Sequence, residues 1–261
     1  MQQAAENLQR HLQLMDKTIT FKHSGHSGDI IYSLAMVQRA YEVYGKKAIY
    51  YIKLDVKTDV KGHSMGATMV NKNTFEFLKP LLMQQPYIED VIPYEGQQVD
   101  YDLDVFRTQH INLSANSIAL WNAYSYPEIY PDISKKWLHV PGKNLKDLKP
   151  IVARSLRYTN PFISYAVIGD AYFIGMDEEY KFSKQQLNCK FEHLKVDTAL
   201  GMAIFINNCP LFLGNQSMPF AIAEGLKVDR ILEHYQACPN VIPVGGNAKI
   251  FHTQEQLIKI I

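Results

Sequence analysis

The chain has 261 residues, enough for two small domains or one large domain with a substantial core. Its 47% hydrophobic content and formal net charge of +1 describe an ordinary globular protein and give no support for a nucleic-acid partner. The three cysteines form no CxxC pair, which argues against a disulfide framework and favours a reducing compartment. Neither a signal peptide nor a transmembrane segment is predicted, so we expect a cytoplasmic protein.

The N-terminal part predicts a parallel β-α-β unit. In chain order we expect an amphipathic helix over 3–16, a strand over 19–21, a glycine loop over 22–29, a helix over 30–44 that ends at Gly45, and a strand over 48–54. Two strands joined through a helix in this way pair in parallel.

The next stretch predicts further α/β structure and then a junction. We expect a loop over 57–69, helices over 73–83 and 114–124, and strands over 91–94 and 103–107. Residues 127–149 are rich in proline, lysine and turn residues, which is typical of a domain boundary. We therefore predict one domain over residues 1–146 and a second over residues 147–261.

The second half repeats the alternation. Strands are predicted over 151–155, 172–174, 210–213, 230–232 and 240–244, and helices over 178–182, 198–207 and 253–260. The fold class is therefore α/β, twice over. No period of 20–50 residues indicates a repeat protein.

The stretch 210–233 carries the clearest local signal for a site. Gly214 suits a sharp turn after a buried strand because glycine can adopt positive φ. Ser217 occupies a helix N-cap position and Pro219 the first turn. The free backbone N–H groups at 216–218, with the helix dipole, would form an anion site. An ordinary strand-to-helix turn of a parallel sheet would look the same.

A second loop with the same setting is Gly25 to Asp29, GHSGD, between the first strand and its helix. Open α/β sheets place ligands at this end of their strands. The loop is neither a P-loop nor GxGxxG. Asp29 either accepts a proton from an attacking hydroxyl or is a first-turn acid favoured by the helix dipole.

Charged residues follow two other predicted strands. Arg154, Ser155 and Arg157 lie at the carboxyl end of the strand predicted over 151–155 and could reach phosphate oxygens, or form a solvated basic turn. The acids at 177–179 could hold a ribose hydroxyl, or only favour a helix N-terminus.

The nine histidines do not predict a metal site. His23 with His26, and Cys189 with His193, have plausible local spacing, but neither pair has a second pair at zinc-site spacing. Cys209 lies in an apolar stretch and is expected in the core.

Three ordered motifs resemble the heptosyltransferase-type glycosyltransferases, a GT-B family. Residues 27–35, SGDIIYSLA, are similar to the family's "GD-apolar-apolar-x-x-Leu-Pro" loop and helix. Residues 212–226, FLGNQSMPFAIAEGL, are similar to its "GxDSGPxHLAAAxG" segment, and residues 172–179, YFIGMDEE, lie between them and are similar to its "hhhhG-x-x-x-E" strand and turn. The resemblance spans about residues 18–233.

The resemblance implies two Rossmann-like domains that face each other across a cleft, the first on the acceptor side and the second on the side of a nucleotide-sugar. It implies Asp29 as the catalytic base, Arg154 or Arg157 as the cation that neutralises a leaving diphosphate, and Glu178 or Glu179 near the nucleoside. It implies a nucleotide-diphospho-sugar as the donor substrate, with no cofactor and no metal. The implied donor-binding residues are Gly28, Arg154, Ser155, Arg157, Glu178, Gly214, Asn215, Gln216, Ser217 and Met218.

The chain departs from the family's motifs at four positions. Gln216 replaces an acid, Met218 a glycine, Ala221 a histidine and Ala35 a proline. The main hypothesis is a glycosyltransferase that moves a sugar from a nucleotide-diphospho-sugar to a saccharide or glycoconjugate. The departures at Gln216 and Ala221 favour a non-catalytic nucleotide or sugar-nucleotide binder instead, and a sugar-nucleotide epimerase is a third hypothesis.

Overall fold

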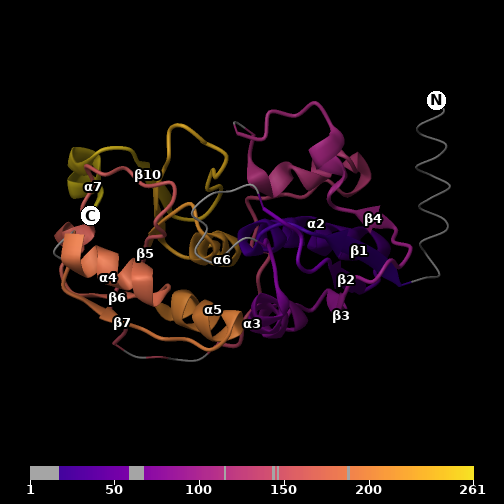
Figure 1. The fold of residues 1–261 in the computed structure, drawn as a ribbon, viewed down its shortest axis with the longest axis horizontal. Helices are drawn as coiled ribbons and strands as arrows, with labels where there is room; N and C mark the ends of the chain where they lie inside the picture. The colour runs from indigo at the N-terminus through magenta and orange to yellow at the C-terminus, as the bar shows by residue number, and fades with distance from the viewer. Residues whose placement is uncertain (1–17, 59–67, 115, 143–144, 146, 187–188) are drawn as a thin grey trace.

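The computed structural model describes residues 18–58, 68–114, 116–142, 145, 147–186 and 189–261. The helix predicted over 3–16 and most of the loop predicted over 57–69 lie outside these residues. The described residues form two separate sheets, and the strand pairs within both are parallel (Figure 1). The fold class is therefore α/β with two Rossmann-like halves, as predicted.

The first sheet has the strand order β3-β2-β1-β4. Its strands are β1 (Ile19–His23), β2 (Ala48–Ile52), β3 (Ile88–Pro93) and β4 (Tyr101–Asp102), and its helices are α2 (Ser27–Tyr44) and α3 (Lys72–Met83). Every second residue of β1 and β2 is buried, and α2 ends where Gly45 adopts a φ of 68°. The β-α-β unit predicted at the N-terminus is confirmed, although α2 begins three residues earlier than expected.

The second sheet has the order β10-β9-β8-β5-β6-β7. Its strands are β5 (Ile151–Ala153), β6 (Ala171–Phe173), β7 (Phe191–His193), β8 (Phe212–Asn215), β9 (Arg230–Glu233) and β10 (Ala248–Phe251). Its helices are α4 (Asp177–Gln186), α5 (Ala199–Asn208), α6 (Met218–Leu226) and α7 (Gln254–Ile260). This is the doubly wound order of Rossmann folds, in which the chain reverses direction across the sheet between two central strands.

Both sheets have such a reversal point, and these points position the candidate site. In the first sheet the chain moves outward from β1 through β2 and β3, and β4 then returns to the other side of β1. In the second sheet β5 and β8 are the two central strands on either side of the reversal. A crevice opens outside the carboxyl ends of such strands, where ligands bind in open α/β sheets.

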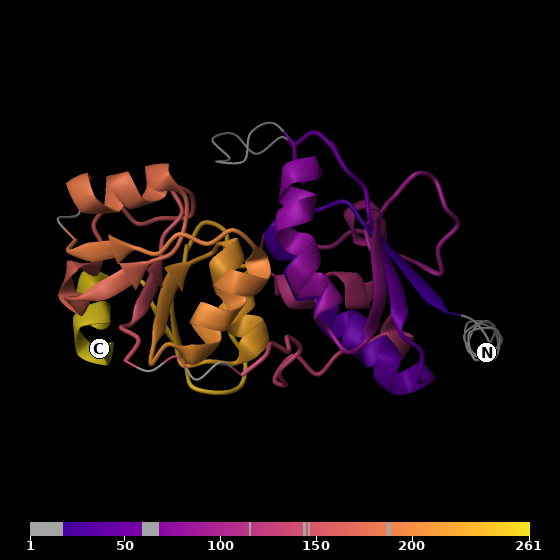
Figure 2. The same cartoon turned by 90° about the horizontal axis from the view of Figure 1, so that it is seen from below.

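The two halves meet through helices. Helix α2 packs against α6, and α3 packs against α5, as the two views in Figures 1 and 2 show. A connecting segment links the central pair: the Trp137 indole donates to Ile31 O of α2 at 3.1 Å, and the N–H groups of Trp137 and Leu138 both donate to Gly225 O of α6 at 3.0 Å. Among the described residues, no helix is long and apolar enough to cross a membrane.

Three element predictions are wrong, and the strands β4, β7 and β10 were not predicted. The stretch 103–107 is not a strand, because β4 ends at Asp102 and a 3-10 turn, η1 (Val105–Thr108), follows. The helix predicted over 114–124 is two 3-10 turns, η2 (Ile118–Leu120) and η3 (Asn122–Tyr124). The last strand is β10, not 240–244, and β7 was missed because only three residues of mixed polarity form it.

The expectation for Gly214 is also wrong. It does not adopt positive φ, because it lies inside β8 and pairs with Ala153 and Leu232. Glycine is required there for space instead: an added Cβ would lie 2.9 Å from Ala153 O. The strands of the first sheet all precede residue 146 and those of the second all follow it, while the domain division at 146/147 stays a prediction.

We predict that Gly214→Ala lowers the free energy of unfolding by about 1–3 kcal/mol, because the added methyl group overpacks a central strand. Gly142→Ala is the matched control, since an added Cβ there meets nothing within 4 Å. It should change stability by less than about 0.5 kcal/mol. Urea denaturation of the three proteins measures both, and equal midpoints for all three would contradict the packing argument.

Candidate functional site

A cavity of about 770 Å³ lies where the carboxyl ends of the two sheets face each other. The first half contributes Gly28, Asp29 and Arg107 to its walls, and the second half contributes Arg157, Glu179, Ser217 and Met218, among others. Its volume is within the range of small-molecule sites, which are most often found between domains or at the reversal points of α/β sheets.

The N-termini of two helices converge on this cavity. Helix α2 starts at Ser27 and α6 starts at Met218, and a Cβ added at Gly28 would lie 3.9 Å from Met218 Cα. The Ser217 hydroxyl donates to Asn215 O at 3.1 Å and makes no cap to α6, so the first N–H groups of this helix are not used by that side chain. Two positive dipole ends and free N–H groups favour an anionic ligand.

Asp29 lies in the first turn of α2 and is partly buried, with 18% of its side chain exposed. Its Oδ2 accepts the His26 N–H at 3.1 Å and lies 3.8 Å from Arg107 Nη2. Burial raises the pKa of this carboxyl, and the charges on His23, Arg107 and Arg157 oppose that shift. A carboxylate with a raised pKa is a stronger base than an exposed one, so the site suits proton removal.

The glycine at position 25 lets these groups approach one another. A Cβ added at Gly25 would lie 2.7 Å from Asp29 Oδ2, 3.0 Å from Arg107 Nη2 and 2.4 Å from His23 Cε1. The neighbouring His26 is neutral at physiological pH, because burial and the charges of Arg157 and Arg107 lower its pKa to about 4. The negative charge of the Asp29 carboxylate is therefore balanced by Arg107 and Arg157 and not by His26.

Arg107 is a site residue that the sequence did not predict. Its Nε lies 3.4 Å from Asp104 Oδ1, and its guanidinium covers the Phe106 ring with a centroid distance of 4.7 Å. No local pattern could identify it, since it reaches Asp29 only because β4 pairs with β1 across about 80 residues of chain.

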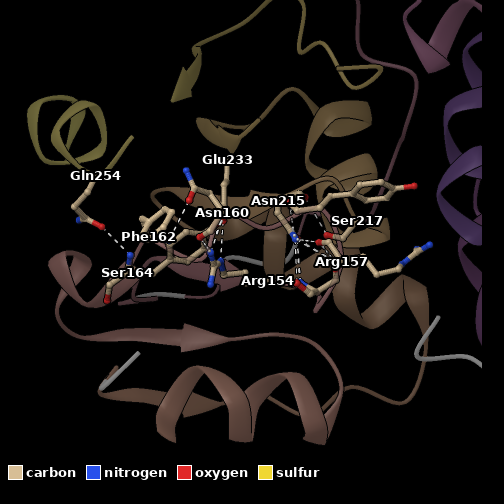
Figure 3. A network of polar contacts seen from close by, with 12 residues as sticks. Arg154, Arg157, Asn160, Phe162, Ser164, Asn215, Ser217, Glu233 and Gln254 are labelled. Atoms are coloured by element: carbon tan, nitrogen blue, oxygen red, sulfur yellow. Dashed lines mark hydrogen bonds and ion pairs between the residues drawn. The ribbon is translucent and has the colours of Figure 1, made fainter. Parts of the chain in front are cut away.

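Arg154, one of the predicted donor-binding residues, is engaged in a buried ion pair. Its Nε and Nη2 donate to the two carboxylate oxygens of Glu233 at 2.7 and 2.9 Å, and both side chains are almost fully buried. Glu233 also accepts from the Asn160 N–H at 2.7 Å (Figure 3). The Tyr165 hydroxyl donates to the same carboxylate at 2.6 Å. Arg154 lines the cavity, but the geometry gives its guanidinium a structural role in this ion pair.

Arg157 has a different environment. It lies beside Asn215 and Ser217, apart from the Arg154–Glu233 pair (Figure 3), and its guanidinium covers the Tyr158 ring at 5.3 Å. With the residues that the structure describes, this guanidinium makes no hydrogen bond or ion pair. Of the two arginines predicted to neutralise a diphosphate, Arg157 is the one available to a ligand.

Asn215 and Ser155 shape the loop that presents Arg157. The Asn215 amide donates to Arg157 O at 2.6 Å, and its Oδ1 accepts the Ser155 N–H at 3.0 Å. Tyr158, the next residue, has a φ of 53°, which is uncommon for a residue with a side chain. Asn215 is fully buried and does not line the cavity, whereas Ser155 does.

Of the acids predicted at 177–179, the structure brings Asp177 and Glu179 to the cavity, but not Glu178. Glu178 is exposed and does not line it, whereas Glu179 is buried, lines it and accepts the Met176 N–H at 2.9 Å. Burial raises the pKa of the Glu179 carboxyl. Helical position explains the difference, since the two side chains leave α4 on different sides.

In the described part of the chain, no group of three or more His, Cys, Asp and Glu side chains could hold a metal ion. His23 Nδ1 accepts the Gly25 N–H at 2.7 Å, and His193 stacks on Tyr180 and contacts Gly175 O at 3.0 Å. Burial raises the pKa of the Cys209 thiol to about 12, so this thiol is not a nucleophile at neutral pH.

We predict that Glu233→Gln lowers the free energy of unfolding by about 3 kcal/mol, because it leaves the Arg154 charge buried without a counter-charge. Arg157→Ala, which removes a guanidinium without such a partner, should change stability by less than about 0.5 kcal/mol. Chemical denaturation distinguishes the two. Equal losses of stability would contradict the different roles assigned to the two arginines.

No protein-family model and no curated protein sequence matches this chain, but solved structures do. The E. coli heptosyltransferase WaaC with ADP superposes with a TM-score of 0.63 at 10% identity, covering 94% of this chain and 98% of that one. A glycosyl transferase family 9 protein from Veillonella parvula DSM 2008 superposes with a TM-score of 0.62 at 12% identity, covering 93% of this chain and 87% of that one. E. coli ADP-heptose LPS heptosyltransferase II superposes with a TM-score of 0.61 at 11% identity, covering 93% of this chain and 97% of that one. The chain therefore has the fold of the heptosyltransferases, over most of its length.

Proposed function

We propose that this protein is a glycosyltransferase that moves a sugar from a nucleotide-diphospho-sugar to a hydroxyl of a saccharide or glycoconjugate. One observation carries the proposal: the N-termini of α2 and α6 and the carboxylate of Asp29 meet in one cavity between two Rossmann-like halves. Two of the similar structures support it, since one is a heptosyltransferase with ADP and another is an ADP-heptose LPS heptosyltransferase.

The donor diphosphate would bind at the N-terminus of α6. This end of the cavity is lined by Ser217, Met218 and Arg157, which could offer two backbone N–H groups and a guanidinium. They would hold the phosphate oxygens and stabilise the charge that develops as the bond from the sugar to the diphosphate breaks. Glu179 would lie near the nucleoside. The proposal includes no metal ion, because the helix dipole and the arginine supply the positive charge.

The acceptor would bind on the side of the first half. As its hydroxyl oxygen bonds to the anomeric carbon of the sugar, Asp29 takes the hydroxyl proton, and the nucleoside diphosphate leaves. The His26 N–H and the Arg107 guanidinium, at 3.1 and 3.8 Å, hold the carboxylate in place. We place this reaction in the cytoplasm, on the cysteine pattern of the sequence.

A non-catalytic nucleotide binder is the second candidate. Its support is that two residues at donor-binding positions are already bonded inside the protein: Arg154 to Glu233, and the Gln216 amide to Cys238 O and Asn240 Oδ1. Such a protein would bind a nucleoside diphosphate but would release none from a sugar nucleotide.

We predict that Asp29→Asn slows the release of nucleoside diphosphate from sugar nucleotides by about 10²–10⁴-fold, the usual contribution of a general base. The affinity for the free nucleoside diphosphate should stay nearly unchanged. A coupled assay with ADP-, UDP- and GDP-sugars and a set of glycan acceptors measures release, and calorimetry measures binding. Asp170→Asn, at an exposed carboxylate, is the control.

The same assay has a pH signature. Asp29 acts in its ionised form, so wild-type activity should fall as the pH drops through its folded-state pKa, which burial places above the usual range of aspartate. The residual activity of Asp29→Asn should lack this acidic limb. Unchanged activity in Asp29→Asn would contradict the role of the base, and binding without any release in the wild type would favour the non-catalytic candidate.

A further inference from the structure

Asn240 contacts both halves of the protein at the edge of the cavity. It lies in the segment after β9, and its Oδ1 accepts from Gln216 Nε2 at 3.0 Å. Toward the first half, its Nδ2 donates to Leu113 O at 3.3 Å and its backbone oxygen accepts the Ile118 N–H at 2.8 Å. The side chain and the backbone oxygen of Asn240 thus connect the turn before α6 to the opposite wall of the cavity.

On the donor side this contact is firmly held. Gln216 is 5% exposed, and it also donates to Cys238 O at 2.9 Å and accepts the Tyr235 N–H at 2.8 Å. A carboxylate could not make the two bonds that Gln216 Nε2 donates. Gln216 is also adjacent to Ser217 in the chain. A ligand bound at the N-terminus of α6 would therefore restrict the motion of Gln216 and, through their hydrogen bond, that of Asn240.

On the acceptor side a series of packed side chains connects the neighbours of Asn240 to Asp29. Leu113, Ile118 and Trp121, here called the acceptor wall, all line the cavity. The Trp121 ring packs on Phe106 with a centroid distance of 5.3 Å. The guanidinium of Arg107 also covers the Phe106 ring, and its Nη2 lies 3.8 Å from Asp29 Oδ2.

We propose that Asn240 is a positioning residue that sets the acceptor wall relative to the donor turn, so that occupancy of the donor site orders the wall. The inference rests on the proposed function, because it takes the N-terminus of α6 as the diphosphate site. The physical reason is that η2 is only a short 3-10 turn that bonds to Asn240 O through the Ile118 N–H, and the Asn240 side chain fixes the place of that oxygen by its bonds to Gln216 and Leu113 O. Fixing Gln216 and Asn240 therefore removes motion from the wall as well.

Hydrogen–deuterium exchange of peptides that contain Ile118, Ala119 and Leu120 tests this, with calorimetry on the same samples. The probes are ADP, UDP and GDP, and each protein is compared with and without a saturating concentration of the nucleotide that binds the wild type. We expect that nucleotide to slow exchange in these peptides by at least ~5-fold in the wild type.

Two variants at position 240 should lose most of this protection while binding the nucleotide within about 3-fold of wild type. Asn240→Ala removes both side-chain bonds. Asn240→Asp keeps an oxygen that accepts from Gln216 and lacks the N–H that donates to Leu113. Asn247→Ala is the matched control, because Asn247 bonds to Asp229 at an exposed position away from the cavity, and should behave as the wild type.

The outcomes separate the two proposals. Protection that persists in Asn240→Ala, or that is absent in a wild type shown by calorimetry to bind the nucleotide, would overturn the role of Asn240. If no nucleotide binds the wild type, the proposed function fails at its first step and this inference fails with it. Thermal melting of each variant shows that a lost response is not lost folding.

Discussion

The packing of α2 against α6 is the contact on which the candidate site depends. Each helix follows a central strand of its own sheet, so each N-terminus points to the crevice at a reversal point. The Trp137 segment fixes the pair with one hydrogen bond to α2 and two to α6, and Gly225 leaves room for it, since an added Cβ there would lie 2.7 Å from Leu138 Cγ. This contact makes one cavity from two sheets.

Several polar side chains around the cavity are engaged inside the protein. Arg154 neutralises Glu233, Asn215 holds the loop that carries Arg157, and the Gln216 amide holds the segment after β9. These bonds satisfy groups whose burial without partners would be costly. In the proposed function a ligand would be bound by the N-terminus of α6, the guanidinium of Arg157 and the carboxylates of Asp29 and Glu179, which all line the cavity.

The sequence predicted the parts of this structure that local signals define. The unit at residues 18–54 and the unit at 210–233 have regular apolar periods, and both formed the predicted order of strand, helix and strand, although Gly214 lies inside β8 and not in a turn. The 3-10 turns between 105 and 124 could not be predicted, because distant partners hold them, including the bond from Ile118 N–H to Asn240 O. For the same reason the pairing of Arg154 with Glu233, 79 residues away, was not foreseen.

The central claim is that this cavity binds a nucleoside diphosphate through the N-terminus of α6 and Arg157. Calorimetric titration of ADP, UDP, GDP and CMP into the wild type and into Arg157→Ala tests it most directly. We predict that one nucleoside diphosphate binds the wild type and binds Arg157→Ala at least ~10-fold more weakly, the usual effect of losing charge-assisted hydrogen bonds. No binding at millimolar concentration, or equal binding by both proteins, would contradict the account.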